Sequence, residues 1–331
     1  APMKSWLSFS VLLLVCIITD TALAASASPQ KVVITPASFT EREGMLVVAH
    51  HQGFFRKHNL DAQLVLMPNA PLALSVLTSG DSQFYYGTTS GASLGAVLNG
   101  LDGVFVAAFI NRLVGAFAVG HDIKTPADLK GKKIGVASLS GGNWMFTMLA
   151  FEHWGIHPKR DGITFRVIGD TGARVQAVAS GLIDGSMMGY THAAILKCQG
   201  FPILADVADL NVPFQDSGLF TRKSFLMQHP ETVENVLRAL LEAIAFIQEP
   251  ENKTAVLKSL AQWLRLPKPE DALDGYDFMR KMYTRRIYPS PEGIRNAIRV
   301  LTLTNEKFAR LKAEDLVDDR IVRKLEKEGL F

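Results

Sequence analysis

Short apolar runs alternate with helical segments over the first part of the chain. Apolar residues in the runs are continuous enough for buried strands, whereas those between the runs recur at helical spacing. Glycine or asparagine follows several of the helical segments, as at helix ends. This alternation over short connections predicts an α/β fold with a largely parallel sheet. The predicted strands are 31–35, 62–67, 83–86 and 104–109, and the predicted helices are 42–58, 71–78 and 90–98.

The same pattern restarts near residue 116 and predicts a second α/β unit. Thr125 is a capping residue followed by Pro126, with Asp128 in the first turn, which is typical of a helix start. A strand at 219–222 is predicted to return to the first unit. The strands expected in the second unit are 116–119, 132–137, 163–168 and 186–190, and the helices are 143–153, 173–179 and 192–197.

The last third of the chain is predicted to be helical. Residues 230–247 place seven aliphatic side chains on one stripe, which indicates an amphipathic helix. Further helices are expected at 254–264, 269–283, 290–308 and near the C-terminus. We therefore expect a helical C-terminal region packed against the α/β core.

The first 27 residues have the pattern of a secretory signal peptide. Lys4 precedes an apolar run from Trp6 to Ile18, and small residues follow up to Ala27. The run is shorter than the roughly 20 residues that a membrane-spanning helix needs. We expect residues 1–27 to be removed and the protein to be periplasmic or otherwise extracytoplasmic. A retained anchor and lipid attachment at Cys16 are the alternatives.

Composition excludes several classes of protein. About half of the 331 residues are apolar (48%) and 20% are charged, a mixture typical of a globular chain rather than a disordered or fibrous one. The formal net charge is only +3, and no unbroken basic cluster indicates nucleic-acid binding. Cys16 and Cys198 lack the spacing of metal ligands, so we expect neither a metal site nor a cofactor.

Five runs resemble the extracytoplasmic solute-binding proteins of ABC importers, in the branch that binds sulfonates, taurine, nitrate and thiamine-pyrimidine precursors. They lie in the same order as in that family and cover nearly the whole mature chain. The runs are 46–60 (Leu-x-x-Ala-x-x-x-Gly-Phe-Phe), 77–84 (Ser-Gly-Asp), 128–136 (Asp-Leu-Lys-Gly-Lys-Lys-Ile-Gly-Val), 177–185 (Ser-Gly-x-x-Asp-Gly) and 229–233 (His-Pro-Glu-x-Val).

This resemblance implies a type II periplasmic-binding-protein fold, in which two α/β lobes close on a small molecule. We expect lobe 1 to comprise residues 31–119 plus 215–331 and lobe 2 to comprise residues 120–214. Two crossovers would join the lobes, and the C-terminal helices would belong to lobe 1.

Ligands of open parallel sheets bind beyond the carboxyl ends of the strands, which predicts where the site lies. The corresponding family segments hold its ligands and support the same choice. The segment from Ser138 to Trp144 joins a strand to a helix start, where glycines let backbone amides approach an anion. The candidate ligand-binding residues are Ser38, Phe39, Thr40, Gly87, Thr88, Thr89, Ser90, Asn111, Arg112, Ser138, Ser140, Gly141, Gly142, Asn143, Trp144, Asp170, Thr171, Tyr190 and His192.

Each candidate also has a structural interpretation. Ser140 and Asn143 can cap a helix, and Trp144 can be a core residue rather than an aromatic wall of the site. Arg112 is expected either to pair with an anionic ligand group or to form a salt bridge. Tyr190 and His192 can donate hydrogen bonds or stack on a flat ligand.

The expected function is capture of a small organic solute and its delivery to a membrane permease with a cytoplasmic ATPase subunit. Loops rich in glycine and in hydrogen-bond donors favour an organic sulfonate or carboxylate, either aliphatic or aromatic. A neutral thiamine-pyrimidine-like heterocycle is the alternative ligand. An enzyme on the same fold is a further alternative, although the cysteine-rich run of the fungal pyrimidine synthases is missing. We expect a monomer without catalytic activity; a sensor role remains open.

Overall fold

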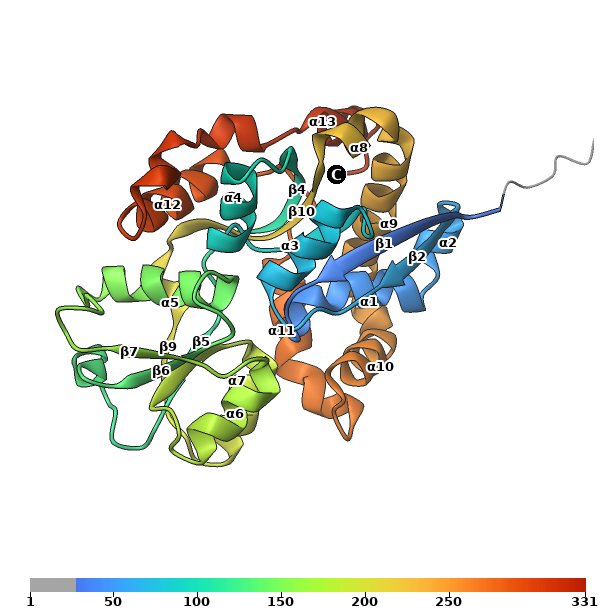
Figure 1. The fold of residues 1–331 in the computed structure, drawn as a ribbon. Helices are drawn as coiled ribbons and strands as arrows, with labels where there is room; N and C mark the ends of the chain where they lie inside the picture. The colour runs from blue at the N-terminus through green and yellow to red at the C-terminus, as the bar shows by residue number, and fades with distance from the viewer. Residues whose placement is uncertain (1–27) are drawn as a thin grey trace, which may run out of the picture.

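The computed structural model describes residues 28–331 and contains two five-stranded sheets (Figure 1). The predicted signal peptide lies outside the described residues. The first sheet has the strand order β2-β1-β3-β10-β4, in which β10 runs antiparallel to both of its neighbours. The sheet and the helices packed on it form lobe 1. Its strands are β1 (Gln30–Pro36), β2 (Leu60–Leu64), β3 (Phe84–Gly87), β4 (Gly103–Arg112) and β10 (Pro213–Arg222).

The second sheet has the order β7-β6-β8-β5-β9 and, with the helices α5 to α7, forms lobe 2. β5 runs antiparallel to β8 and β9. The predicted boundary after residue 119 assigns β5 to lobe 1, but its pairing places it in the second sheet. β9 was not predicted. The strands are β5 (Ala116–Val119), β6 (Lys133–Val136), β7 (Thr164–Val167), β8 (Gly185–Met188) and β9 (Ile203–Asp206).

Helices cover the sheets much as the apolar periodicity predicts. The expected helix at 42–58 is interrupted because Gly53 takes a left-handed conformation (φ 76°), and Asn59 (φ 56°) ends the second piece. The helices before β10 are η1 (Glu41–Glu43), α1 (Gly44–His51), α2 (Phe54–Lys57), α3 (Ala70–Ser79), α4 (Gly91–Leu98), η2 (Pro126–Leu129), α5 (Gly142–His153), α6 (Thr171–Ala179), α7 (Tyr190–Cys198) and η3 (Val207–Leu210).

The C-terminal third is helical, as predicted, and packs on lobe 1 (Figure 1). The predicted segment 290–308 is divided into two helices, with Leu303, Thr304 and Asn305 between them. The helices after β10 are α8 (Lys223–Gln228), α9 (Pro230–Gln248), η4 (Pro250–Asn252), α10 (Lys253–Leu264), η5 (Pro269–Ala272), α11 (Leu273–Met282), α12 (Pro291–Thr302), η6 (Glu306–Arg310), η7 (Ala313–Leu316) and α13 (Arg320–Lys327).

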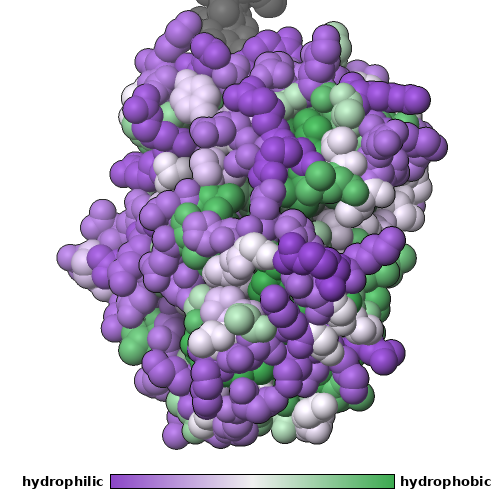
Figure 2. Space-filling view, turned by 90° about the vertical axis from the view of Figure 1, so that its left-hand side faces the viewer, coloured by the Kyte–Doolittle hydropathy of each residue, from purple (hydrophilic) through white to green (hydrophobic). Residues whose placement is uncertain are grey.

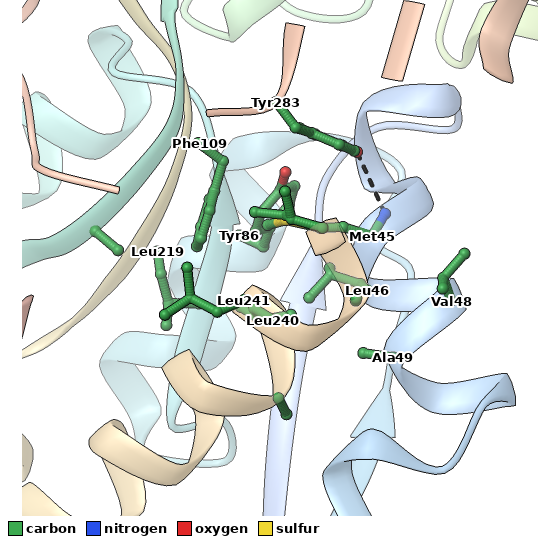
Figure 3. Packing of buried hydrophobic residues seen from close by; sticks show 14 of the residues in the cluster. Met45, Leu46, Val48, Ala49, Tyr86, Phe109, Leu219, Leu240, Leu241 and Tyr283 are labelled. Carbon is green, nitrogen blue, oxygen red and sulfur yellow. Dashed lines mark hydrogen bonds between the residues drawn. The ribbon is translucent and has the colours of Figure 1, made fainter. Parts of the chain in front are cut away.

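The largest core cluster lies between α1, α9 and the first sheet (Figure 3). Leu240 and Leu241 of α9 belong to the same cluster as Met45 and Leu46 of α1. Tyr283 is buried with them, and its hydroxyl accepts a hydrogen bond from the Met45 amide at 3.2 Å. Helices α1 and α9 are therefore held by apolar burial, and a buried polar group is satisfied within that cluster.

A second core cluster includes residues of both lobes. Phe146 of α5 in lobe 2 meets Phe214 of β10 edge to face, with ring centroids 5.6 Å apart. Hydrophilic side chains cover much of the outer face seen in Figure 2, and apolar residues form small separate patches there. Within residues 28–331, none of the helices combines the length and the hydropathy that crossing a membrane would require.

Candidate functional site

A cavity of about 230 Å³ lies where the two lobes meet. Residues following β1, β2 and β3 line it from lobe 1, and residues following β6 and β7 line it from lobe 2. The cavity thus lies beyond the carboxyl ends of parallel strands in both sheets, where this architecture places ligands. The lobes already touch beside it, because the Ala92 amide of lobe 1 donates to the Ser140 carbonyl of lobe 2 at 2.8 Å.

The lobe 1 wall carries charged groups that are paired within that wall. Arg42 lies 3.6 Å from Asp216, whose side chain has no exposed surface. The Arg42 guanidinium also lies over the ring of Phe146, 4.7 Å from its centroid. Glu43 accepts hydrogen bonds from the hydroxyls of Ser38 (2.8 Å) and Thr40 (3.0 Å). These groups are therefore occupied by partners from their own lobe, except for the contact of Arg42 with Phe146.

Burial changes the acidity of both carboxyl groups in this wall. Desolvation raises the pKa of Glu43 to about 7, although Arg42 and the Ser38 and Thr40 hydroxyls oppose the shift. Desolvation also raises the pKa of Asp216 to about 6, and Arg42 again opposes it. Glu43 consequently carries only part of a negative charge near neutral pH.

The lobe 2 wall contains a buried cation whose partners are neutral. Arg174 is only 4% exposed and lines the cavity. Its guanidinium donates to the Gly169 carbonyl at 2.5 Å and to the Thr171 hydroxyl at 3.0 Å. Within the described chain its Nε atom has no hydrogen-bond partner, and the same is true of the buried Ser138 hydroxyl. Burial and the nearby Arg42 charge lower the pKa of Arg174 to about 10, while the Asp170 carboxylate opposes the shift, so Arg174 remains protonated at neutral pH.

The turn before α5 forms part of the cavity lining. Gly142 lies so close to lobe 1 that a β-carbon there would be 2.7 Å from the Thr88 hydroxyl. Asn143 uses its side chain to connect strand ends, accepting from the Ala137 amide at 3.3 Å and donating to the Met187 carbonyl at 2.7 Å. Glycine at this turn is needed for close approach of the lobes, and Asn143 holds the turn in place.

About half of the predicted site residues are brought together at the cavity. Asp170 is among them and also caps α6 by accepting from the Ala173 amide at 2.8 Å. The predicted residues that line the cavity are Ser38, Phe39, Gly87, Thr88, Ser138, Gly141, Gly142, Asn143, Asp170 and Thr171. Their contact with a ligand remains a prediction.

Trp144 and the end of β4 lie away from the cavity lining. Trp144 is 7% exposed and packs edge to face on Phe165 in the core, so it does not form the predicted aromatic wall. Asn111 donates to the Tyr288 carbonyl at 3.1 Å, and Arg112 contacts the sulfur of Met282. The end of β3 lines the cavity and the end of β4 does not, because the antiparallel strand β10 lies between these two strands in the sheet.

Four hydroxyl-bearing candidates have structural roles beside the cavity rather than in its lining. Thr40 caps η1 in a reciprocal arrangement with Glu43. At the start of α4 the Ser93 hydroxyl accepts from the Ser90 amide at 2.9 Å, and the buried Ser90 hydroxyl has no hydrogen-bond partner within the described residues. Thr89 is buried and accepts from the Gln215 amide group at 3.2 Å. Ser140 provides the carbonyl that joins the lobes, as described above. Of these four residues, Thr40 thus has a capping role.

Tyr190 and His192 lie on the first turn of α7, which contacts lobe 1 directly. The Tyr190 hydroxyl donates to Asp206 at 2.6 Å and accepts from the Gly115 amide at 3.3 Å. His192 is 5% exposed, and its ring lies 6.3 Å from that of Phe39. Burial, assisted by the charge of Arg174, lowers the pKa of His192 to about 4, so it is neutral at neutral pH.

Several cavity residues were missed by the sequence prediction. Arg174 follows Thr171 by one helical turn, so helical spacing could have found it. The segment after β2 was missed because that strand was expected to continue to residue 67, whereas it ends at Leu64. No sequence signal distinguishes Arg42 from other helix-start residues. The missed residues are Ala37, Arg42, Glu43, Leu66, Met67, Pro68, Asn69, Ala70, Tyr85, Ala137, Arg174, Ser217 and Arg265.

Solved structures with related folds include both binding proteins and an enzyme. The alkanesulfonate-binding protein SsuA from Xanthomonas axonopodis pv. citri, bound to MOPS, gives a TM-score of 0.73 at 20% identity, covering 89% of this chain and 100% of that one. The nitrate-binding protein NrtA from Synechocystis PCC 6803 gives 0.75 at 16% identity, covering 90% and 89%. The desulfurization enzyme DszB gives 0.60 at 16% identity, covering 91% and 99%.

These similarities confirm the predicted fold, the two-lobed periplasmic-binding-protein architecture. At the sequence level, a Brucella abortus protein with the provisional name of binding protein is 27% identical over 233 residues, which is 67% of each chain. Residues 43–253 match the family described as NMT1/THI5 like. Because this match covers more than half of the sequence, the chain belongs to the NMT1/THI5-like family.

Proposed function

We propose that this protein is the solute-binding component of an ABC importer and that it captures a small organic anion between its lobes. The observation that carries the proposal is the buried guanidinium of Arg174, which lines the cavity and has only neutral partners in the described chain. Burying an uncompensated cation costs free energy, and an anionic ligand would remove that cost. A guanidinium also offers the planar pair of donors that suits a carboxylate or a sulfonate.

The acidic groups of the cavity do not supply this missing charge. Glu43 is hydrogen-bonded within lobe 1, and its raised pKa leaves it partly protonated near pH 7. Asp170 is exposed and caps α6 through the Ala173 amide. Asp216 lies beside Arg42 rather than Arg174. Among residues 28–331, Arg174 forms no salt bridge, and the exposed Asp170 only partly offsets its charge.

The remaining lining favours an organic molecule over a bare inorganic ion. A volume of about 230 Å³ suits a small molecule. Phe39, Leu66, Met67 and Ala70 provide apolar surface on the lobe 1 side of the cavity. A ligand with an anionic group toward lobe 2 and an apolar part toward lobe 1 would match both walls.

The proposed biological context follows from the fold and from the N-terminal sequence. Capture requires only that the lobes close around pre-placed donors, so no chemical step is invoked. Residues 1–27 would direct the chain out of the cytoplasm, where it would act as a monomer. The loaded form would deliver its solute to a membrane permease driven by a cytoplasmic ATPase subunit.

A thermal-shift screen of the exported protein tests the proposal. The panel contains alkanesulfonates including MOPS, aliphatic and aromatic carboxylates, nitrate, and neutral aminopyrimidines. A ligand at 100 times its dissociation constant stabilises the native state by about 2.7 kcal/mol, which raises the melting temperature by several degrees. We expect an organic sulfonate or carboxylate to produce this shift. A shift with aminopyrimidines alone would favour the neutral-heterocycle alternative.

Mass spectrometry of the denatured protein and of the recovered ligand completes the test. A co-purified ligand would explain a panel without hits, and its formula would show whether it is an anion. Recovery of the hit unchanged after incubation supports capture without catalysis. Recovery of a chemically altered product would contradict it and favour an enzyme, a role that DszB shows this fold can support.

A further inference from the structure

The carboxylate of Glu41 reaches from lobe 1 to the start of α7 in lobe 2. Its Oε1 accepts a hydrogen bond from the Tyr190 amide at 2.5 Å. Glu41 has no exposed surface and does not line the cavity. Tyr190 is the first residue of α7, where the backbone amides lack partners within the helix. Glu41 therefore fulfils, from the other lobe, the role that a capping side chain usually has within one segment.

Glycines on both sides permit this close approach. A β-carbon at Gly189 would lie 2.7 Å from Glu41 Oε1. A β-carbon at Gly275, in α11 of lobe 1, would lie 2.4 Å from the hydroxyl of Thr191. Gly189 has φ −69° and ψ 160°, which any residue can adopt. Its small size is therefore needed for the contact with Glu41 and not for the local backbone.

The residue that binds Glu41 also holds the two segments that join the lobes. The Tyr190 hydroxyl accepts a hydrogen bond from the Gly115 amide in the first crossover, and it donates one to the Asp206 carboxylate at the start of the second crossover. Its ring lies 5.0 Å from that of Phe278 in α11. A change in the angle between the lobes must therefore disturb contacts of Tyr190.

We propose that Glu41 is a closure latch, which holds the N-terminus of α7 against lobe 1 and thereby favours the closed arrangement of the lobes. Helix α6 packs on α7, so the latch also fixes the position of Arg174 above the cavity. The functional value of the latch rests on the proposed capture of a solute. Its physical action does not, because it favours closure whether or not a solute is bound.

Amide hydrogen exchange and small-angle X-ray scattering of the protein without added ligand test the latch. Glu41→Met removes the acceptor but keeps the length of the side chain. Loss of the acceptor leaves the Tyr190 amide without a partner, which accounts for an equilibrium change of about tenfold. We expect the amide of Tyr190 to exchange at least ~10-fold faster and the radius of gyration to increase. Glu41→Gln keeps a carbonyl acceptor and should restore wild-type exchange and size.

Two further variants distinguish a latch from general destabilisation. Gly189→Ala places a methyl group against Glu41 from the opposite lobe and should give the same two changes with Glu41 intact. Glu152→Gln alters an exposed ion pair with Arg299, which also joins the lobes, and should give neither change. Unchanged exchange at Tyr190 in both Glu41→Met and Gly189→Ala would overturn the latch. Since these measurements use no ligand, their outcome is independent of the screen above.

Discussion

The charged side chains in the two walls of the cavity differ in the partners they contact. In lobe 1, Arg42 lies beside Asp216, and Glu43 accepts hydrogen bonds from Ser38 and Thr40. In lobe 2, Arg174 is buried but hydrogen-bonds only to a carbonyl and a hydroxyl within the described residues. The buried charges of the lobe 1 wall have polar partners within lobe 1, whereas the lobe 2 wall holds a buried cation that forms no salt bridge within the described residues.

This difference separates charges that support the fold from charges that are available to a ligand. A buried pair is expensive to break, because removal of one member leaves the other uncompensated. A buried cation with neutral partners lowers the stability of the empty protein and gains the most when an anion enters. Stability measurements should therefore respond to changes in lobe 1, and affinity measurements to changes in lobe 2.

The largest effect on stability is expected for Asp216→Ala. The change leaves Arg42 buried without its carboxylate, which should lower the free energy of unfolding by about 3–5 kcal/mol. Denaturant unfolding measures this value. The exposed pair of Arg295 and Glu314 provides the control, since Arg295→Ala should cost less than about 1 kcal/mol. Equal losses for the two variants would show that burial does not determine the importance of the pair.

Trp144→Ala tests whether α5 contributes core packing or a ligand contact. The indole is buried against Phe165, so its truncation should cost about 3–5 kcal/mol of stability. In conditions where the variant remains folded, its affinity for the panel hit should stay within a few-fold of wild type. Calorimetry that showed intact stability and weakened binding would instead restore Trp144 as an aromatic wall of the site.

Arg174→Met should weaken binding of an anionic hit by ~30-fold or more, equivalent to about 2 kcal/mol. The unfolding free energy should fall little or rise, because an uncompensated buried cation has been replaced by an apolar chain of similar length. Arg265→Met is the matched control, because Arg265 lines the same cavity but is exposed. Comparable losses of affinity in both variants would contradict the special role of the lobe 2 wall.

Glu43 should contribute to the pH dependence of the free energy of unfolding. Its pKa is raised from 4.5 to about 7 by burial, so between these values the folded protein binds more protons than the unfolded chain. Stability therefore falls as pH rises from 4.5 to 7. Glu43→Gln should reduce this fall, and Asp216 should preserve part of it. Urea unfolding of the wild type and of Glu43→Gln at pH 5, 6 and 7 measures how the free energy of unfolding changes with pH in each protein. An identical pH dependence in the two proteins would contradict a raised pKa of Glu43.

Much of the fold could be predicted because strand and helix periodicities are local properties of the sequence. The strand 219–222 was expected to return to the first unit, and it is the last part of β10. The interruption at Gly53 depends on a left-handed turn, and the start of lobe 2 at β5 depends on strand pairing. Neither follows from apolar periodicity alone.

The cavity could be predicted only in outline. The rule that ligands lie at strand ends found Ser138, Asp170 and Thr171, because it depends on topology. It could not distinguish the ends of β4 and β8 from the others, since strand order and the docking of α7 on lobe 1 decide which ends face the cavity. Nor does that rule alone find Arg174, which lies one helical turn beyond Thr171 and forms no salt bridge within the described residues.

The measurement that tests the central claim most directly is a crystal structure of the protein with the anion identified in the screen. Our account predicts that the sulfonate or carboxylate group lies within hydrogen-bonding distance of the Arg174 guanidinium, with its apolar part toward Phe39 and Met67 of lobe 1. An anionic group bound to Arg42 or Arg265, with Arg174 still hydrogen-bonded only to Gly169 and Thr171, would contradict the proposed difference between the two walls.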